Sequence, residues 1–187
     1  MSSSDTGESF RFKVVLLGDA RVGKTSIKNR VMGKGYNQKY FMTVGVDFSL
    51  KEMKGHSLLI WDLAGQKGFD QIRSNYYKGA KGAVLVYDIT MRESFDNLAR
   101  WIEEMKNHSE GNVPIILAGN KVDLRDSTDE YITVQEGKEK AIELANKFNN
   151  SVFFIETSAL TGYNIEKAFE LLLDKMIEDL KANEQRS

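Results

Sequence analysis

The stretch GDARVGKT (Gly18–Thr25) follows an apolar run, FKVVLL (12–17), and opens a segment with helical potential. Its Gly-x4-Gly-Lys-Thr spacing matches a motif in which a strand, a glycine-containing loop and a helix meet. In that geometry the glycines let backbone N–H groups curl around an anion, and the helix N-terminus adds its dipole. The stretch therefore predicts an α/β fold organised around a phosphate-binding loop.

Positions in this loop suit contacts with a nucleotide and its metal ion. The ammonium of Lys24 is placed to contact β- and γ-phosphates, and the hydroxyl of Thr25 can bind Mg²⁺. The remaining loop positions expected to contact nucleotide are Ala20, Arg21, Val22, Gly23 and Ser26. A chance Gly-Lys turn is the alternative, and the preceding strand and following helix argue against it. The loop alone leaves adenylate-type kinases, ATPases and GTPases open.

Strand-like and helix-like segments alternate along the rest of the chain. Apolar runs and alternating patterns predict strands at 12–17, 44–53, 57–63, 82–87, 113–117 and 152–155. Helices are expected at 25–31 and after three start signals: Thr90 with Glu93, Thr133 with Glu136, and Asn164. Six strands and five helices predict a mostly parallel sheet with one antiparallel edge strand, covered by helices on both faces.

Length and composition limit the possible classes of protein. The 187 residues suit one domain, expected at 10–180, with 1–9 and 181–187 as flexible ends. A net charge of -1 gives no reason to expect nucleic-acid binding, and no apolar run is long enough to span a membrane. The absence of cysteine excludes disulfides, thiolate metal sites and a cysteine nucleophile. We expect a cytoplasmic monomer.

The segment AGNKVD (118–123) follows a predicted strand and indicates which base is bound. The Asp123 carboxylate can accept from N1–H and the 2-amino group of guanine, whereas adenine offers neither donor. Two charge-assisted bonds worth roughly 1.5–3 kcal/mol each discriminate by about 10²–10⁴. Asn120 and Lys121 can hold the loop and flank the base, and ETSA (156–159) can offer backbone N–H groups to guanine O6.

The segment WDLAGQ (61–66) at the end of the third predicted strand indicates the reaction. Asp62 is placed to hold Mg²⁺ through water, and Gly65 permits the backbone to approach the γ-phosphate. Gln66 is placed to orient an attacking water. Each residue alone is better interpreted as a turn residue, but together they predict GTP hydrolysis.

With these motifs, the chain resembles the Ras superfamily of small GTPases, and within it the Rab family most. The resemblance covers about residues 10–180 and lies in TVGVDF (43–48), LLIWDLAGQ (58–66), YYKGA (76–80) and VLVYDIT (84–90). It implies a Mg²⁺-dependent GTP/GDP switch in membrane traffic or related signalling. Switch I at about 34–46 and switch II at about 64–78 would meet effectors, an exchange factor and a GTPase-activating protein. Hydrolysis would be slow without the activator.

The resemblance also implies roles for individual residues. Thr43 would bind Mg²⁺ through its hydroxyl and sense the γ-phosphate through its N–H, acting with Lys24 and Gln66 in catalysis. Tyr36 would pack across the guanine ring, and Tyr40 would belong to the same nucleotide site.

Three aromatic residues match a trio that Rab proteins present to effectors. They are Phe48, Trp61 and Tyr76. Packing in the core or on the face of the sheet is the alternative interpretation of these three residues.

Four departures from the Rab pattern stand out. Ala20-Arg21 replaces a small pair such as Ser-Gly, and QKGF (66–69) replaces Gln-Glu-Arg-Phe. Ser158-Ala159-Leu160 places an apolar residue where a lysine stem usually lies beside the base. The chain ends KANEQRS without the cysteines that Rab proteins prenylate. A removed tail, attachment through a partner, a soluble protein or a lineage without this lipid would each account for that ending.

Two other functions compete with the switch. A GTP-binding scaffold with little hydrolysis is left open by Ala20, although Thr43 and Gln66 argue against it. A nucleoside monophosphate kinase would need an arginine-rich acceptor site, which the sequence does not indicate, and NKxD would be unexplained.

Overall fold

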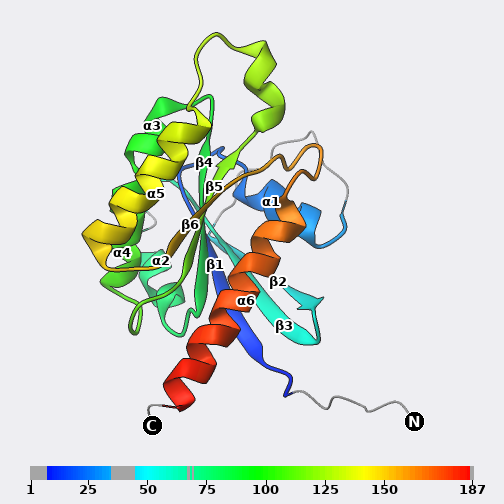
Figure 1. Ribbon diagram of the computed structural model, residues 1–187, viewed down its shortest axis with the longest axis vertical. Helices are drawn as coiled ribbons and strands as arrows, with labels where there is room; N and C mark the ends of the chain where they lie inside the picture. The colour runs from blue at the N-terminus through cyan, green and yellow to red at the C-terminus, as the bar shows by residue number, and fades with distance from the viewer. Residues whose placement is uncertain (1–7, 35–44, 67, 69, 186–187) are drawn as a thin grey trace.

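One six-stranded sheet forms the centre of the molecule (Figure 1). The computed structural model describes residues 8–34, 45–66, 68 and 70–185, and the structural statements below concern these residues. The strand order is β2-β3-β1-β4-β5-β6; β2 runs antiparallel to β3, and the other pairs are parallel. The strands are β1 (Arg11–Leu17), β2 (Val46–Met53), β3 (His56–Leu63), β4 (Gly82–Asp88), β5 (Ile115–Asn120) and β6 (Val152–Glu156). The predicted fold class is confirmed.

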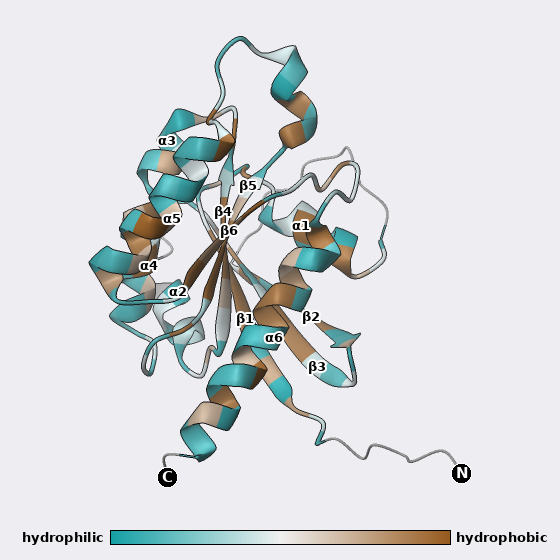
Figure 2. Ribbon diagram, in the orientation of Figure 1, coloured by the Kyte–Doolittle hydropathy of each residue, from teal (hydrophilic) through white to brown (hydrophobic). Residues whose placement is uncertain are grey.

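Helices cover both faces of this sheet. They are α1 (Lys24–Val31), α2 (Asp70–Tyr77), α3 (Arg92–Asp96), α4 (Leu98–Lys106), α5 (Val134–Phe148) and α6 (Ile165–Glu184), with a 3-10 helix η1 (Val122–Ser127). Apolar residues of α1 and α6 pack in one cluster on one face, and those of α2 to α5 pack in a second cluster on the other. In Figure 2 the strands between these layers are coloured apolar, and much of the helical surface is hydrophilic.

The central strand β4 shows why the sheet is parallel here. All seven of its residues are buried, with Val84 and Val86 in one cluster and Ala83, Leu85 and Tyr87 in the other. A continuous apolar run, without alternation, is typical of a strand that is covered on both faces. The loops that follow the strands then gather at one edge of the sheet.

The helix expected after Thr90 is divided, which gives six α-helices in the described residues where five were predicted. The predicted capping box at Thr90 is wrong, because Asp88 takes both Thr90 donors: the backbone N–H at 2.9 Å and the hydroxyl at 2.8 Å. Helix α3 starts instead behind Met91, without a side-chain cap. The chain then breaks at Asn97, whose ψ of -4° departs from helical geometry, before α4 begins.

The capping box at the start of α5 is confirmed. The N–H of Glu136 donates to the Thr133 hydroxyl at 3.2 Å, and the N–H of Thr133 donates to the Glu136 carboxylate at 2.8 Å. The bond from the Thr133 backbone, followed by those from Arg92 and the Thr133 hydroxyl, lowers the pKa of Glu136. This helix therefore starts where the sequence places it.

Helix α6 begins directly after Asn164, as expected, but it lacks the predicted side-chain cap and extends beyond its expected end. Asn164 is at the N-cap position, but its side chain makes no capping bond and donates to the carbonyl of Glu156 at 2.9 Å. The helix continues to Glu184, beyond the boundary expected at residue 180. In the described ranges, no helix combines the length and apolar character needed to cross a bilayer.

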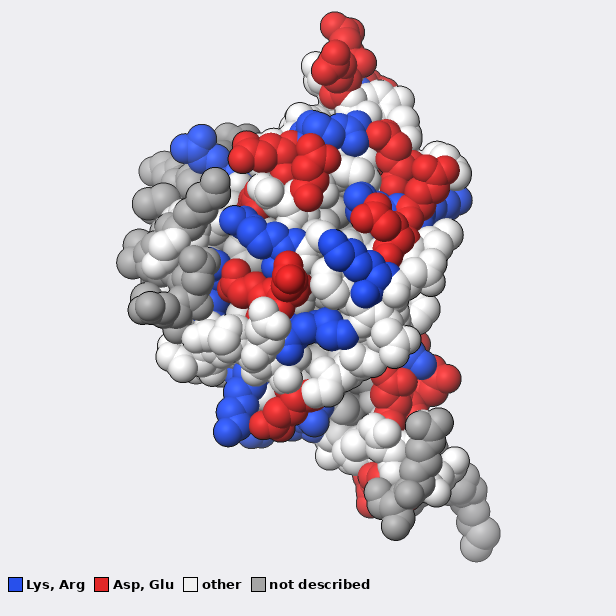
Figure 3. Space-filling view, turned by 90° about the vertical axis from the view of Figure 1, so that its left-hand side faces the viewer, with Lys and Arg blue, Asp and Glu red and all other residues white. Residues whose placement is uncertain are grey.

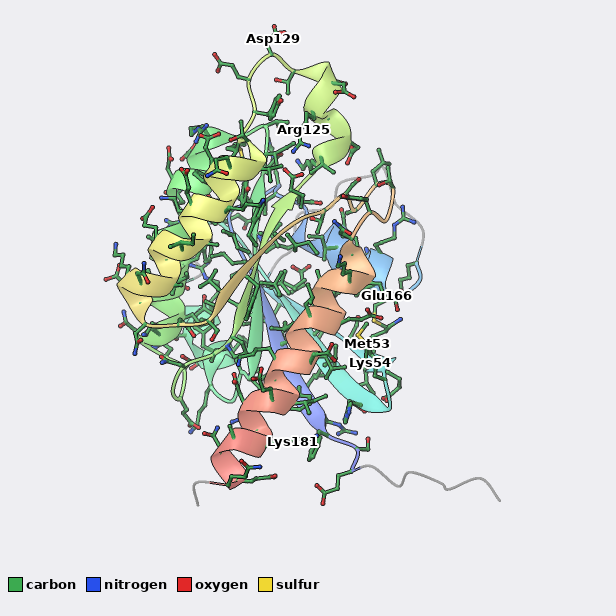
Figure 4. The ribbon with its side chains drawn as sticks, viewed as in Figure 1. Met53, Lys54, Arg125, Asp129, Glu166 and Lys181 are labelled. Atoms are coloured by element: carbon green, nitrogen blue, oxygen red, sulfur yellow. The ribbon has the colours of Figure 1, made fainter. Side chains whose placement is uncertain are left out.

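The β2–β3 hairpin is tied to α6. It turns at Lys54 and Gly55, which have φ angles of 50° and 78°. Lys54 pairs with Asp174 at 3.0 Å and Lys51 with Glu166 at 3.8 Å, and Met53 is buried in the cluster that includes α6. Figure 4 shows the labelled hairpin residues alongside Glu166. The edge of the sheet is thus fixed to the last helix.

Candidate functional site

Most of the predicted site residues lie at the carboxyl ends of the strands, at the upper end of the sheet in Figure 1. The loop at 18–23 follows β1, and 62–66 includes the end of β3. The segments 120–123 and 157–160 lie at the ends of β5 and β6. Tyr36, Tyr40 and Thr43 fall outside the described residues, so their roles stay predictions.

The lysine of the phosphate loop is almost completely buried. Lys24 is the first residue of α1, and its Nζ donates to the carbonyls of Gly18 and Asp19, each at 2.7 Å. Burial lowers the pKa of Lys24 to about 8, against the opposing attraction of Asp62 and Asp19. An ammonium has three donors, and these carbonyls account for two. The desolvated cation is therefore well suited to an anionic ligand.

Asp62 and Thr25 form the candidate metal site. The Thr25 hydroxyl donates to Asp62 Oδ2 at 2.5 Å, and Oδ1 of the same buried carboxylate has no hydrogen-bond partner among the described residues. Burial raises the pKa of Asp62, while the bond from Thr25 and the charge of Lys24 act in the opposite direction. A hydroxyl, a carboxylate oxygen and water are ligands that Mg²⁺ prefers.

The set of acidic residues fits a metal ion that is shared with a nucleotide. Among the residues that the structure describes, no group of three histidine, cysteine, aspartate or glutamate side chains could hold a metal. Mg²⁺ is commonly bound through one or two protein carboxylates together with substrate phosphates. Asp62 and Thr25 therefore fit Mg²⁺ without an all-protein cage.

The side chain of Asp19 points away from the phosphate loop and anchors it. Its carboxylate accepts from Trp101 Nε1 at 2.7 Å, Asn97 Nδ2 at 2.7 Å and Arg100 Nη2 at 3.2 Å. These three residues lie at the break between α3 and α4 and in α4 itself. This anchor was not predicted, because nothing local to GDARVGKT indicates a partner about 80 residues away.

The segment expected to form switch II begins in close contact with the phosphate loop. A Cβ atom on Gly65 would lie 2.5 Å from Lys24 Nζ and 2.6 Å from the backbone nitrogen of Ala20. No side chain fits between these groups, so the position requires glycine. Gly65 thus lets the backbone pass directly over the loop, and its approach to the γ-phosphate stays a prediction.

A buried arginine holds the backbone on both sides of Gly65. Arg73 Nη1 donates to the carbonyls of Ala64 and Gln66, each at 3.0 Å. Its Nε and Nη2 donate to both carboxylate oxygens of Glu104 on α4, at 2.7 and 2.9 Å, and the Tyr77 hydroxyl also donates to Glu104. The role of Arg73 was not predicted, since an arginine on a short helix is usually exposed.

Asn120 joins the phosphate loop to the loop after β6. Its Nδ2 donates to the carbonyl of Val22 at 2.8 Å. Its Oδ1 accepts from the Thr157 hydroxyl and from the Ala159 N–H, each at 3.2 Å. Gly23, with a φ of 103°, has no room for a side chain because Asn120 Nδ2 lies against it. The prediction that Asn120 holds the loop agrees with these contacts.

The other residues expected around the base also have partners in the protein. The Ser158 hydroxyl donates to Asp123, and Lys121 forms an ion pair with Asp88 at 2.6 Å. The N–H of Ser158 donates to the carbonyl of Tyr163 at 3.1 Å. Within 156–159, where donors to guanine O6 are predicted, the N–H groups of Thr157, Ser158 and Ala159 thus already have acceptors in the protein.

Arg30 of α1 holds the loop after β6 through hydrogen bonds to two of its carbonyls. Its Nε donates to the carbonyl of Ala159 at 2.9 Å, and its Nη2 donates to the carbonyl of Leu160. Leu160 is 44% exposed, so its side chain lies at the surface of the loop and not in the core. In the phosphate loop, the positions not yet described vary in burial. Val22 is in the core, Ser26 is half-buried and Arg21 is exposed with a φ of 68°.

The aromatic trio forms one continuous cluster. The Phe48 and Trp61 rings are stacked with centroids 5.0 Å apart, and the Tyr76 ring lies 5.2 Å from that of Trp61. Phe48 is 58% exposed, and Lys13 Nζ lies 4.9 Å from the Trp61 ring. The cluster is therefore open to solvent at Phe48.

The charges on the molecular surface are mixed in sign. On the molecular face shown in Figure 3, acidic and basic side chains are interspersed.

Comparison with known proteins gives consistent matches along nearly the whole chain. A family model described as "Ras family" matches residues 13–178. "Ras-related protein RABA5e" of Arabidopsis thaliana is 40% identical over 178 residues, which cover 92% of this chain and 78% of the relative. "Ras-related protein Rab11A" of Lotus japonicus is 42% identical over 169 residues, covering 88% of this chain and 71% of the relative.

Proposed function

This chain belongs to the Ras family of small GTPases, and on that premise we propose that it is a Rab-like, Mg²⁺-dependent switch that binds GTP and GDP and hydrolyses GTP. One observation carries the proposal. A buried ammonium, a hydroxyl and a carboxylate meet at the loop that follows β1, and one oxygen of the carboxylate has no partner among the described residues. Lys24, Thr25 and Asp62 together present the charges that a nucleotide's phosphates and their metal ion would complement.

In this proposal the chain's residues position GTP for attack by water. Lys24 binds the β- and γ-phosphates, and backbone N–H groups at 20–26 surround their oxygens. Mg²⁺ held by Thr25, Thr43 and, through water, Asp62 would neutralise charge that develops on the phosphates. Gln66 orients the water whose oxygen attacks the γ-phosphorus as the bond to the β-phosphate oxygen breaks. GDP and phosphate are the products.

Guanine is selected at the other end of the site. Asp123 accepts two N–H bonds from the base, and Ser158 keeps its carboxylate oriented. The N–H of Ala159 is shared between Asn120 and guanine O6, because its 3.2 Å bond in the protein is long enough to yield to a second acceptor. Leu160 covers the edge of the base, Lys121 flanks it, and Tyr36 and Tyr40 complete the site from switch I.

The nucleotide state is read by protein partners through the two switches. GTP tethers Thr43 and the backbone at Gly65, and hydrolysis releases both. Effectors contact the aromatic trio beside these segments, and an exchange factor and an activating protein act on the same surface. An activator that supplies an arginine would accelerate hydrolysis by ~10³–10⁵. The monomer would act at the cytoplasmic side of membranes in traffic or related signalling.

Single-turnover hydrolysis of radiolabelled GTP tests the proposal. The Mg²⁺-loaded protein should release phosphate slowly, and excess GDP but not ADP should compete for binding. Tight GTP binding without phosphate release would identify a scaffold, in line with the methyl group at Ala20. Phosphate transfer to an added nucleoside monophosphate would identify a kinase and overturn the switch. Thr43→Ala should abolish nucleotide-dependent partner binding while GDP affinity stays nearly unchanged.

A further inference from the structure

A second lysine of α1 is buried one helical turn after Lys24. The buried residues of this helix are Lys24, Ile27, Lys28 and Val31, which is the spacing of a single core-facing stripe. Lys24 is assigned to phosphate, whereas Lys28 has no role in the proposed reaction. Its side chain is only 2% exposed, and a lysine is rarely buried to this extent without a charged partner.

The partner of Lys28 is Asp47, at the start of β2. The two side chains form an ion pair, and the carboxylate is 64% exposed, so only the lysine is fully desolvated. Asp47 also lies directly opposite Asp62 in the antiparallel register of β2 and β3. Residues that face each other across such a pair project from the same side of the sheet, with Cβ atoms about 4.5–5.5 Å apart.

Two carboxylates therefore lie side by side where the metal site is expected, and one of them has its own counter-ion. Like charges that are directly opposite in a sheet destabilise it, and Lys28 compensates this pair. Burial is the main cause that raises the pKa of Asp62, but the charge of Lys28 lowers that pKa and the charge of Asp47 raises it. The three groups are thus electrostatically coupled.

We propose that the Lys28–Asp47 ion pair sets the Mg²⁺ affinity of the site, and through it the rate of GDP release. The inference rests on the proposed function, because it assumes that Asp62 and Thr25 hold Mg²⁺. Lys28 neutralises a carboxylate that would otherwise add its charge to that of Asp62 and tighten the site. Asp47 in turn neutralises a buried ammonium that would otherwise repel the cation. Both are positioning residues that act through Asp62.

Charge changes at the two positions must therefore act in opposite directions. Lys28→Leu leaves Asp47 uncompensated and should lower the Mg²⁺ concentration for half-maximal GDP retention by roughly ten-fold. Asp47→Asn leaves Lys28 uncompensated and should raise that concentration by a similar factor. The double variant Lys28→Leu/Asp47→Asn restores neutrality and should return close to the parent. If the pair only supports the fold, both single variants would shift retention in the same direction.

The measurement is the release rate of a fluorescent GDP analogue across buffered Mg²⁺ concentrations, together with the free energy of unfolding of each variant. Lys54→Leu and Asp174→Asn make the same charge changes in an ion pair on the hairpin and α6, and should leave the Mg²⁺ dependence unchanged. The decisive comparison is Lys28→Leu against the double variant. Neither carries the buried ammonium, and they differ only in the charge at 47.

Equal Mg²⁺ dependence in Lys28→Leu and the double variant would overturn the inference. So would a shift of Lys28→Leu toward weaker Mg²⁺ binding. A parent protein that binds no GDP, or retains it equally with and without Mg²⁺, would contradict the proposed function instead. The parent measurement therefore separates the two failures.

Discussion

The base end and the phosphate end of the site are built differently. At the base end, Asn120, Lys121, Asp123 and Ser158 already have partners in the protein. At the phosphate end, Asp62 carries a buried oxygen without a partner among the described residues, beside the desolvated Lys24. The difference separates two tasks. A preorganised base end favours constant recognition of guanine, whereas charge at the phosphate end remains for the nucleotide and its metal to complement.

The largest expected effect comes from a substitution at the base end. Asp123→Ala should weaken GDP binding by about 10²-fold or more, because two charge-assisted bonds of roughly 1.5–3 kcal/mol each are lost. Titration with a fluorescent GDP analogue measures this loss. Asp126→Ala removes an exposed carboxylate from the same 3-10 helix and should have no effect. Unchanged affinity in Asp123→Ala would remove the basis for guanine selection.

The next effect tests whether the backbone on both sides of Gly65, at the phosphate end, is held as rigidly as the base end. Arg73→Leu leaves Glu104 unpaired in a largely buried position, which should lower the free energy of unfolding by about 3–5 kcal/mol. It also frees the carbonyls of Ala64 and Gln66, so GTP hydrolysis should slow while GDP affinity changes little. Urea unfolding and single-turnover hydrolysis measure the two effects.

A double variant distinguishes the two roles of this arginine. Arg73→Leu/Glu104→Leu removes both charges and should recover part of the lost stability. It should not recover hydrolysis, because the carbonyls beside Gly65 remain unheld. Recovery of both would show that Arg73 supports only the fold.

A smaller effect addresses the phosphate end alone. Gln66→Leu should slow hydrolysis about tenfold or more, since water loses its orienting group, while GTP affinity stays near that of the parent. Single-turnover rates and equilibrium titration with a non-hydrolysable GTP analogue give the two quantities. A parent-like rate would mean that another group orients the water, and the phosphate end would then be misassigned.

The smallest effect comes from a substitution at the start of α5, outside both ends of the site. Thr133→Ala removes the capping box of α5 and should cost about 1 kcal/mol of stability. GDP affinity and hydrolysis should not change. Thr133→Ser keeps the hydroxyl and is the matched control in thermal unfolding. A change in nucleotide binding would show that the base end depends on α5.

Local patterns predicted the fold where the chain interacts with its near neighbours. The strand limits agree within three residues, and the capping box at Thr133 joins groups three residues apart. The cap at Thr90 failed because Asp88, just before it, competes for the same donors. Short-range competition of this kind is not visible in a capping pattern, since the pattern considers only residues at fixed spacing.

The parts of the site that the sequence did not indicate are long-range contacts of charged side chains. Asp19 reaches α4, and Arg73 reaches Glu104. Lys28 had a faint signal, because it shares a helical stripe with Ile27 and Val31, where an apolar residue is expected. Periodicity identifies such a position as buried but cannot name its counter-ion, which lies on another strand.

Arg21 shows how the loop tolerates an unusual residue. Its left-handed backbone costs an ordinary residue roughly 1–2 kcal/mol. Glycine would relieve this strain, but its greater freedom in the unfolded chain would cost about 0.4–1 kcal/mol on folding. The two contributions offset one another only in part, which leaves a net cost of roughly 0–1.6 kcal/mol. The mouth of the site can therefore carry a long cation at a modest cost to the folding equilibrium, and its chemistry can vary independently of its shape.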